Sequence, residues 1–154
     1  MNRIVVAILA LSAILMSAKV VQAQDLEKEK EAIEAVVDAY IKTINDGDVD
    51  LARQIWANEG VVTFIGPQGH FKGVEQICER IVMSFKNNFI KRDLKKEDLT
   101  IIVEDNSAWA EFTWQFDAVR SDGRDHNARG RETQIFRKVR GKWKLVHIHY
   151  SSIR

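Results

Sequence analysis

The sequence predicts an α+β domain in which helices pack against an antiparallel sheet. Apolar residues recur every three or four positions in the first half of the chain, which indicates helices. In the second half they form β-branched and aromatic runs separated by short turn signals, as in strands joined by hairpins. A chain of 154 residues, 45% hydrophobic and 29% charged, has the composition of one globular domain.

The N-terminus predicts a secretory signal peptide over residues 1–23. Asn2-Arg3 is a short positive start, residues 4–18 are an apolar run, and Val21-Gln22-Ala23 suits signal peptidase. The alternative is a membrane anchor, but the run is about 15 residues where a spanning helix needs about 20. Lys19 also interrupts it. We therefore expect cleavage near Ala23 and a periplasmic or secreted location.

The expected mature domain, residues 24–154, is nearly neutral. It loses Arg3 and Lys19 from the 23 basic residues and keeps all 22 acidic ones, so its net charge is −1. This charge provides no basic field for nucleic acid, and we expect neither nucleic acid nor, after cleavage, a membrane as partner. Cys78 is the one cysteine and lies on a predicted apolar helix face, which indicates a buried, inert thiol.

Two helices are predicted at the front of the domain. Residues 26–45 carry one apolar stripe, made of Ile33, Val36, Val37, Tyr40, Ile41 and Ile44. Gly47 suits the position just after this helix. Asp48 can then cap a short second helix that carries Leu51, Ile55 and Trp56.

A short strand and a third helix follow. Residues 61–65 are β-branched and aromatic, and Gly66-Pro67-Gln68-Gly69 has the chemistry of a turn. Residues 70–73 lead into a helix with the apolar positions Val74, Ile77, Cys78, Ile81, Val82 and Phe85. We interpret residues 87–98 as a polar, basic connection.

Four strands complete the predicted order α-α-β-α-β-β-β-β, at residues 99–104, 108–119, 129–139 and 143–152. The strand 108–119 is apolar on both faces, because Phe112, Trp114 and Phe116 alternate with a face that includes Trp109 and Val119. One face must meet the helices, and the other is expected to meet a second subunit or a ligand. We expect a homodimer or higher oligomer that buries the face of Phe112, Trp114 and Phe116.

The end of the chain resembles a known family. Residues 132–138 (ETQIFRK) and 141–151 (GKWKLVHIHYS) resemble the closing hairpin of the SnoaL-like branch of the nuclear transport factor 2 (NTF2) superfamily. They are also similar to the association domain of calcium/calmodulin-dependent protein kinase II. Residues 40–48 (YIKTINDGD) and 71–75 (FKGVE) look like the family's first-helix exit and third-helix start, so the resemblance covers about residues 26–152.

This resemblance implies a cone, a curved antiparallel sheet wrapped around helices, with a pocket in its mouth. It also implies dimers or rings formed through the outer face of the sheet. Members include ketosteroid isomerase, polyketide cyclases, dehydratases and scaffolds, so the fold does not select a function. The kinase association domain has three pocket arginines, and by motif their positions here are Glu111, Gln134 and Tyr150. The carboxylate-binding character of that pocket is therefore not expected to carry over.

Glu111 is the leading catalytic candidate. It lies in mid-strand beside Trp109 and Thr113, and a carboxylate in an apolar pocket has a raised pKa that suits acid–base chemistry. The alternative, which we favour slightly, is an ion pair with Arg131. Tyr40 or Tyr150 could donate a hydrogen bond to an enolate oxygen.

The expected pocket lining consists mostly of apolar side chains at helix and strand spacing, which are otherwise ordinary core. It comprises Trp56, Phe64, Ile77, Ile81, Trp109, Thr113, Arg131, Gln134, Phe136 and Ile148. His147 and His149 share one side of a strand, and we interpret them as structural or interface residues rather than metal ligands. His70 is expected in a loop near the mouth, and His126 in a mobile hairpin.

Three function classes remain open. The first is an exported binding or scaffold module with a pocket for a small apolar or amphipathic molecule. The second is an isomerase or lyase that uses a pocket carboxylate, and neither it nor the first is expected to need a cofactor or metal. The third is a partner-binding module that uses the outer sheet face.

Overall fold

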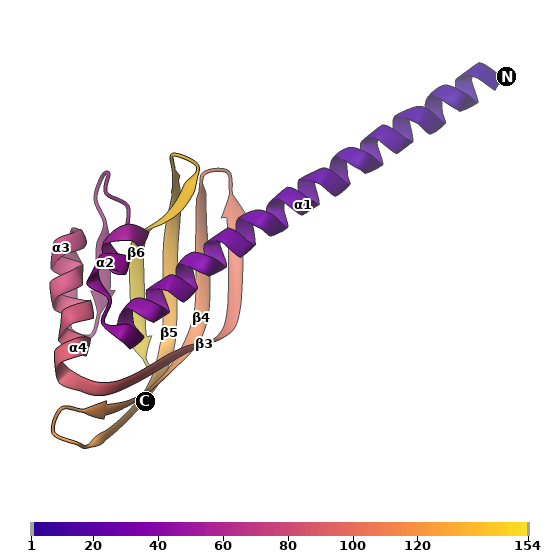
Figure 1. The fold of residues 1–154 in the computed structure, drawn as a ribbon. Helices are drawn as coiled ribbons and strands as arrows, with labels where there is room; N and C mark the ends of the chain where they lie inside the picture. The colour runs from indigo at the N-terminus through magenta and orange to yellow at the C-terminus, as the bar shows by residue number, and fades with distance from the viewer. Residues whose placement is uncertain (1, 154) are drawn as a thin grey trace.

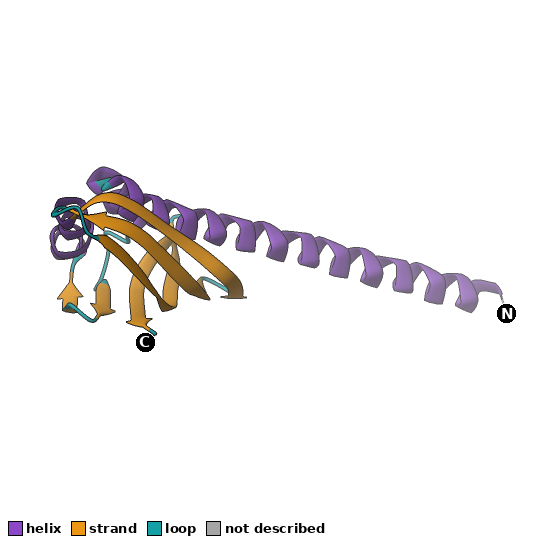
Figure 2. Ribbon diagram, turned by 90° about the horizontal axis from the view of Figure 1, so that it is seen from below, coloured by secondary structure: helices purple, strands orange, loops and turns teal. Residues whose placement is uncertain are grey.

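Over residues 2–153, which the computed structural model describes, six strands form one sheet and helices cover one of its faces (Figures 1 and 2). The strand order is β2-β1-β6-β5-β4-β3, and every neighbouring pair is antiparallel except β1 and β6, which are parallel. The strands are β1 (Thr63–Gly66), β2 (Gly69–Lys72), β3 (Phe89–Glu104), β4 (Ser107–Arg120), β5 (Asp125–Val139) and β6 (Lys142–Ser152). The predicted α+β cone is confirmed, although the sheet is mixed rather than purely antiparallel.

The helices are α1 (Asn2–Asp46), α2 (Val49–Ile55), α3 (Val74–Ile77) and α4 (Ser84–Asn88), with a π-helical segment η1 (Cys78–Met83) between the last two. Asp48 caps α2 as expected, since its carboxylate accepts a hydrogen bond from the backbone N–H of Leu51 at 2.9 Å. The segments α3, η1 and α4 follow one another directly and form one wall of the cone (Figure 1).

Helix α1 runs from the core of the cone out beyond the sheet (Figure 1). Its Ile33, Val37 and Ile44 are buried. Near the edge of the domain, Glu29 accepts hydrogen bonds from Lys138 Nζ at 2.5 Å and Trp143 Nε1 at 2.6 Å. The predicted leader falls on the projecting part, where the side chains of residues 1–21 lie outside the described part of the chain. Over residues 22–153, no helix is long and apolar enough to cross a membrane.

The inner and outer faces of β4 are the reverse of the expected assignment. Phe112, Trp114 and Phe116 are buried against the helices, whereas Trp109 is exposed on the outer face. The more apolar face goes inward because α1 and the α3–α4 wall bury it within the chain itself. The reason given for expecting a dimer through Phe112, Trp114 and Phe116 is therefore wrong.

Three segments expected to be loops are strand. Residues 89–98 belong to β3: Phe89 and Leu94 point into the core, and Arg92 between them donates from Nε to the carbonyl oxygens of Ile44 and Asn45 at the end of α1, 3.0 Å from each. A register shift between Glu97 and Thr100 interrupts the alternation. Asn45 secures this strand to α1, since it donates to the Leu94 carbonyl at 3.0 Å and accepts from the Leu94 N–H at 2.7 Å. Likewise, residues 69–72 form β2, and β5 begins at Asp125.

Candidate functional site

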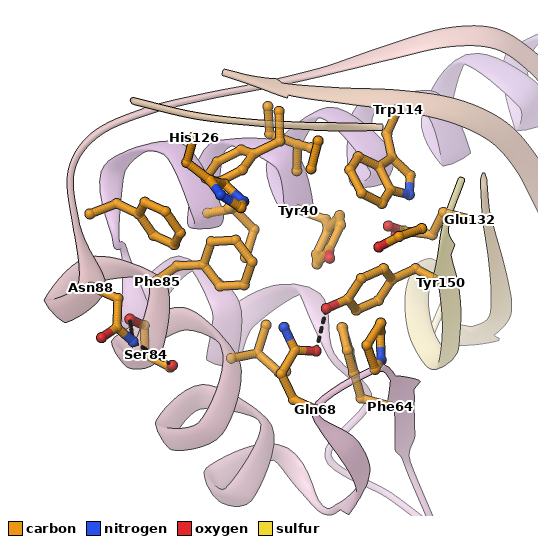
Figure 3. Close-up of a pocket in the computed structure, with 18 of the residues that line it drawn as sticks. Tyr40, Phe64, Gln68, Ser84, Phe85, Asn88, Trp114, His126, Glu132 and Tyr150 are labelled. Atoms are coloured by element: carbon orange, nitrogen blue, oxygen red, sulfur yellow. Dashed lines mark hydrogen bonds between the residues drawn. The ribbon is translucent and has the colours of Figure 1, made fainter. Parts of the chain in front are cut away.

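A cavity of about 490 Å³ lies between the inner face of the sheet and the helices (Figure 3). Its exposed lining residues come from the β1–β2 turn, the end of α4 and the end of β6, so the cavity opens at the mouth of the cone. Most of its wall is apolar and comprises Ile44, Phe64, Ile81, Phe85, Phe89, Leu94, Phe116 and Ala128. A cavity of this size suits a small organic molecule.

Glu132 is the carboxylic acid of this cavity. Its side chain is 4% exposed, and burial raises its pKa to about 8. Gln134 Nε2 donates a hydrogen bond to Glu132 Oε1 at 2.7 Å, which lowers the pKa but does not offset the desolvation. The acid is therefore mostly protonated at pH 7, and it can donate a hydrogen bond as well as accept one.

Tyr40 on α1 and Tyr150 on β6 lie close to this acid (Figure 3). Burial, and then the charge of Glu132, holds the pKa of Tyr40 well above its ordinary value. Burial likewise raises the pKa of Tyr150 to about 12, against the opposing effect of its hydrogen bond to the Gln68 side chain. Both hydroxyls thus remain protonated donors across the physiological range. Gly66 makes room for Tyr150, because a Cβ there would lie 2.2 Å from the tyrosine ring.

Trp114 on β4 completes this end of the cavity. Its ring packs edge-on against Tyr150, with centroids 5.9 Å apart. Its indole Nε1–H is buried and has no hydrogen-bond partner among the described residues. A buried donor without a partner is costly, and Trp114 itself lines the cavity. We call Glu132, Tyr40, Tyr150 and Trp114 the acidic end of the cavity.

The opposite end is basic. Arg120 at the end of β4 donates from Nη2 to His126 Nδ1 on β5 at 2.8 Å. The guanidinium also lies over the ring of Phe89, 5.4 Å from its centroid. Burial, and then the charge of Arg120, lowers the pKa of His126, so the imidazole is neutral. We call Arg120 and His126 the basic end.

Four of the predicted site residues line the cavity, namely Tyr40, Phe64, Ile81 and Tyr150. Five others are buried in the core around it, namely Trp56, Ile77, Gln134, Phe136 and Ile148. Of these five, Gln134 contributes through its hydrogen bond to Glu132.

Glu111, Trp109, Thr113 and Arg131 instead lie on the outer face of the sheet, so the expectation that Glu111 lines the cone is wrong. The physical reason is that the inner and outer faces of β4 are the reverse of those expected, so the odd-numbered side chains of this strand point outward. Glu111 is exposed, and Thr133 and Thr100 are its cross-strand partners. The expected ion pair between Glu111 and Arg131 is not among the ion pairs of the described residues.

Sequence reasoning missed Glu132, Trp114, Arg120 and His126 as cavity residues. The signal for Glu132 was present, because it alternates in step with Gln134 and Phe136 on β5. Placing the Phe112 face inward would have located Glu132 at once, since Phe112 and Glu132 are cross-strand partners. His126 was expected in a mobile hairpin, but it packs against Phe89, with ring centroids 5.3 Å apart.

His147 and His149 both lie on β6, and His147 accompanies His70 and His149 on the outer side of the sheet near β1. The Thr63 hydroxyl is 2.7 Å from His147 Nδ1. Burial, and then the neighbouring histidines, lower the pKa of His147. In the described part of the chain, no group of three or more His, Cys, Asp or Glu residues is arranged to hold a metal ion.

Comparison with known proteins agrees with this architecture. Residues 33–154 match the profile of the SnoaL-like domain family, and the chain belongs to that family within the NTF2-like superfamily. It is 36% identical to an NTF2-like superfamily protein from Salmonella enterica serovar Typhimurium strain LT2, over 81% of this chain and 91% of that one, with a TM-score of 0.77. No curated protein has a significant match.

Two more distant structures share the fold. One is a candidate dehydratase of the NTF2-like family from Streptomyces avermitilis, 17% identical over 82% of this chain and 97% of that one, with a TM-score of 0.73. The other is a candidate calcium/calmodulin-dependent protein kinase II association domain from Xanthomonas campestris. It is 21% identical over 79% of this chain and 85% of that one, with a TM-score of 0.65.

Proposed function

We propose that the protein binds a small, largely apolar molecule in the cone cavity through a carbonyl or hydroxyl oxygen. The observation that carries this proposal is the acidic end, where a buried indole N–H without a partner lies beside the buried carboxyl group of Glu132 (Figure 3). A ligand oxygen placed there would satisfy the indole N–H and could accept a further hydrogen bond from Glu132 or Tyr40. The aromatic wall would bury the rest of the molecule.

Filling the cavity tests this function. Ala128 lines the cavity, so Ala128→Leu should weaken binding of acetophenone, a small aryl ketone, by about tenfold or more, because one methylene in an apolar pocket is worth roughly 1–3 kcal/mol. The matched control is Ala35→Leu on the exposed side of α1, which should bind like the wild type. Isothermal titration calorimetry measures both. Equal affinities for the two variants, or no binding by the wild type, would contradict the proposal.

A second candidate function is a cofactor-independent isomerase or lyase, favoured by the raised pKa of Glu132 beside two tyrosines. The ionised Glu132 would take a proton from the carbon next to a ketone, forming an O–H bond as the C–H bond breaks. The electron pair would move to the ketone oxygen, where Trp114 and Tyr40 donate hydrogen bonds to the enolate. Return of the proton to another carbon would complete an isomerisation.

Exchange of ketone α-protons in D₂O, followed by NMR, tests this chemistry without knowledge of the natural substrate. Glu132→Gln should slow exchange by about 10²–10⁴-fold. Glu111→Gln, the same change on the outer face, should leave the rate unchanged. A protein that binds the ketone but does not accelerate exchange is a binding protein and not an enzyme of this class.

We also propose a homodimer formed through the outer face of the sheet. Ile102, Trp109 and Ile135 are 36%, 37% and 39% exposed, and each is the cross-strand partner of the next. A contiguous apolar patch of this kind favours association with a second copy. Light scattering at micromolar concentration should give twice the chain mass for the wild type and for Val61→Arg in an exposed loop. Trp109→Arg should give the monomer, and a monomeric wild type would contradict the proposal.

Export with removal of residues 1–23 remains the proposed localisation, supported by the charged start, the apolar run and Val21-Gln22-Ala23. The mass of the intact protein, isolated from periplasm or medium, should correspond to residues 24–154. A membrane-bound protein that retains Met1 would contradict it.

A further inference from the structure

The two ends of the cavity lie far apart along the same pair of strands. Arg120 is six residues beyond Trp114 on β4, and His126 is six residues before Glu132 on β5, so all four share the inner face. The antiparallel register pairs Ala118 with His126 and Phe112 with Glu132. Six residues of strand span roughly 20 Å at about 3.3 Å each. Figure 3 shows His126 and Glu132 on opposite sides of the cavity, with Tyr40 between them.

The basic end carries a positive charge that the protein itself does not pair. Arg120 belongs to none of the ion pairs formed within the described part of the chain. Asp122 is close enough for Arg120 to lower its pKa, but Arg124 already binds its carboxylate, with Nη2 2.7 Å from Oδ2. A half-buried guanidinium in an aromatic wall is best stabilised by a carboxylate, and a ligand can supply one.

His126 is oriented to donate a hydrogen bond to such a carboxylate. Its Nδ1 accepts the hydrogen bond from Arg120, so a neutral imidazole carries its proton on Nε2. The Arg120 guanidinium has five N–H donors, of which His126 takes one. The basic end therefore offers several hydrogen-bond donors and a full positive charge. Phe85, Phe89 and Phe116 form the apolar wall beside it.

We infer that the ligand is an amphipathic keto or hydroxy acid whose carboxylate binds Arg120 and His126. This inference rests on the proposed function, because the oxygen of the same molecule occupies the acidic end at Glu132 and Trp114. The apolar middle of the ligand, an aryl or alkyl segment, spans the aromatic wall between the two ends.

Calorimetric titration with phenyl keto acids of increasing chain length, each paired with its methyl ester, tests the inference. A charge-assisted hydrogen bond predicts that the best acid binds the wild type about 10–100-fold more tightly than its ester. In Arg120→Gln, the acid and the ester should bind equally, with the ester as tight as in the wild type, which also shows that the cavity is intact. Arg129→Gln, an exposed arginine on the outer face of β5, should keep the full preference for the acid.

The outcomes separate this inference from the proposed function. Esters that bind as tightly as acids to the wild type overturn the carboxylate site and leave the cavity as a site for neutral ketones. If neither acids nor esters bind, the proposed function fails as well. A preference for the acid that persists in Arg120→Gln but disappears in Arg129→Gln would place the anion on the outer face and overturn the inference. The comparison of acid with ester on the wild type decides the question even if Arg120→Gln does not fold.

Discussion

Replacing Glu132 with glutamine should change how stability depends on pH. Burial holds the pKa of Glu132 at about 8 in the folded protein, against an ordinary value of 4.5. The folded state therefore keeps a proton that the unfolded state releases between these pH values. The free energy of unfolding contributed by this group is fully present below about pH 4.5 and is lost as the pH rises towards 8.

The magnitude follows from the size of the pKa difference. Each unit is worth about 1.4 kcal/mol, so the wild type should lose roughly 4–5 kcal/mol from this group between pH 4.5 and pH 9. Glu132→Gln keeps the shape and can still accept the hydrogen bond from Gln134, but it cannot ionise. The variant should match the wild type to within about 1 kcal/mol at pH 5, and be more stable by several kcal/mol at pH 9.

Urea unfolding followed by circular dichroism across this pH range provides the assay. The difference between variant and wild type cancels the other titrating groups, and Glu111→Gln, exposed on the outer face, should run parallel to the wild type. A Glu132→Gln profile that is also parallel to the wild type would refute the argument, because it would mean that Glu132 ionises as freely in the folded protein as in the unfolded chain.

Two further predictions concern the packing around Gly130 and the ion pair of Glu29 with Lys138. Gly130→Ala should destabilise the fold by about 1–3 kcal/mol, measured by urea unfolding, and should disturb the near-ultraviolet circular dichroism signal of Trp114. The reason is that a Cβ there would lie 1.9 Å from the Ser151 carbonyl oxygen and 2.5 Å from the indole ring. An unperturbed Trp114 signal would contradict this prediction. Glu29→Gln should cost about 1 kcal/mol at pH 7 by weakening its link to Lys138. Since that link lowers the pKa of Glu29, the difference should fade as the pH falls below the ordinary pKa of 4.5. A difference that persists in acid would show that the link is not ionic.

The sequence pattern predicted the helices, the closing strands and the family, because amphipathic period and turn chemistry are local signals. The cap at Asp48 and the stripe through Tyr40 and Ile44 are confirmed for this reason. The same local signals failed at residues 89–98, where charged residues separate the two inward-facing apolar side chains, Phe89 and Leu94. That strand forms because β4 is its hydrogen-bonded neighbour in the sheet. Pairing with another strand is not visible in the local sequence pattern.

The site was only partly predictable for a related reason. The cone pocket and the tyrosines Tyr40 and Tyr150 followed from the resemblance, but the choice of catalytic carboxylate depended on which face of β4 is inner. Both faces carry apolar residues, so alternation alone could not choose between Glu111 and a residue of the next strand. The packing of the helices against Phe112 and Trp114 decides it, and that packing turns Glu132 inward.

The central claim, a cavity that binds a ligand oxygen at its acidic end, is tested most directly at the indole N–H of Trp114. In ¹⁵N-resolved NMR spectra, the chain has four indole resonances, from Trp56, Trp109, Trp114 and Trp143, and Trp114→Phe assigns the relevant one. Adding an aryl ketone should shift the Trp114 resonance downfield as its N–H gains an acceptor, while Trp109 on the outer face stays in place. A shift of Trp109 with no change at Trp114 would contradict the account.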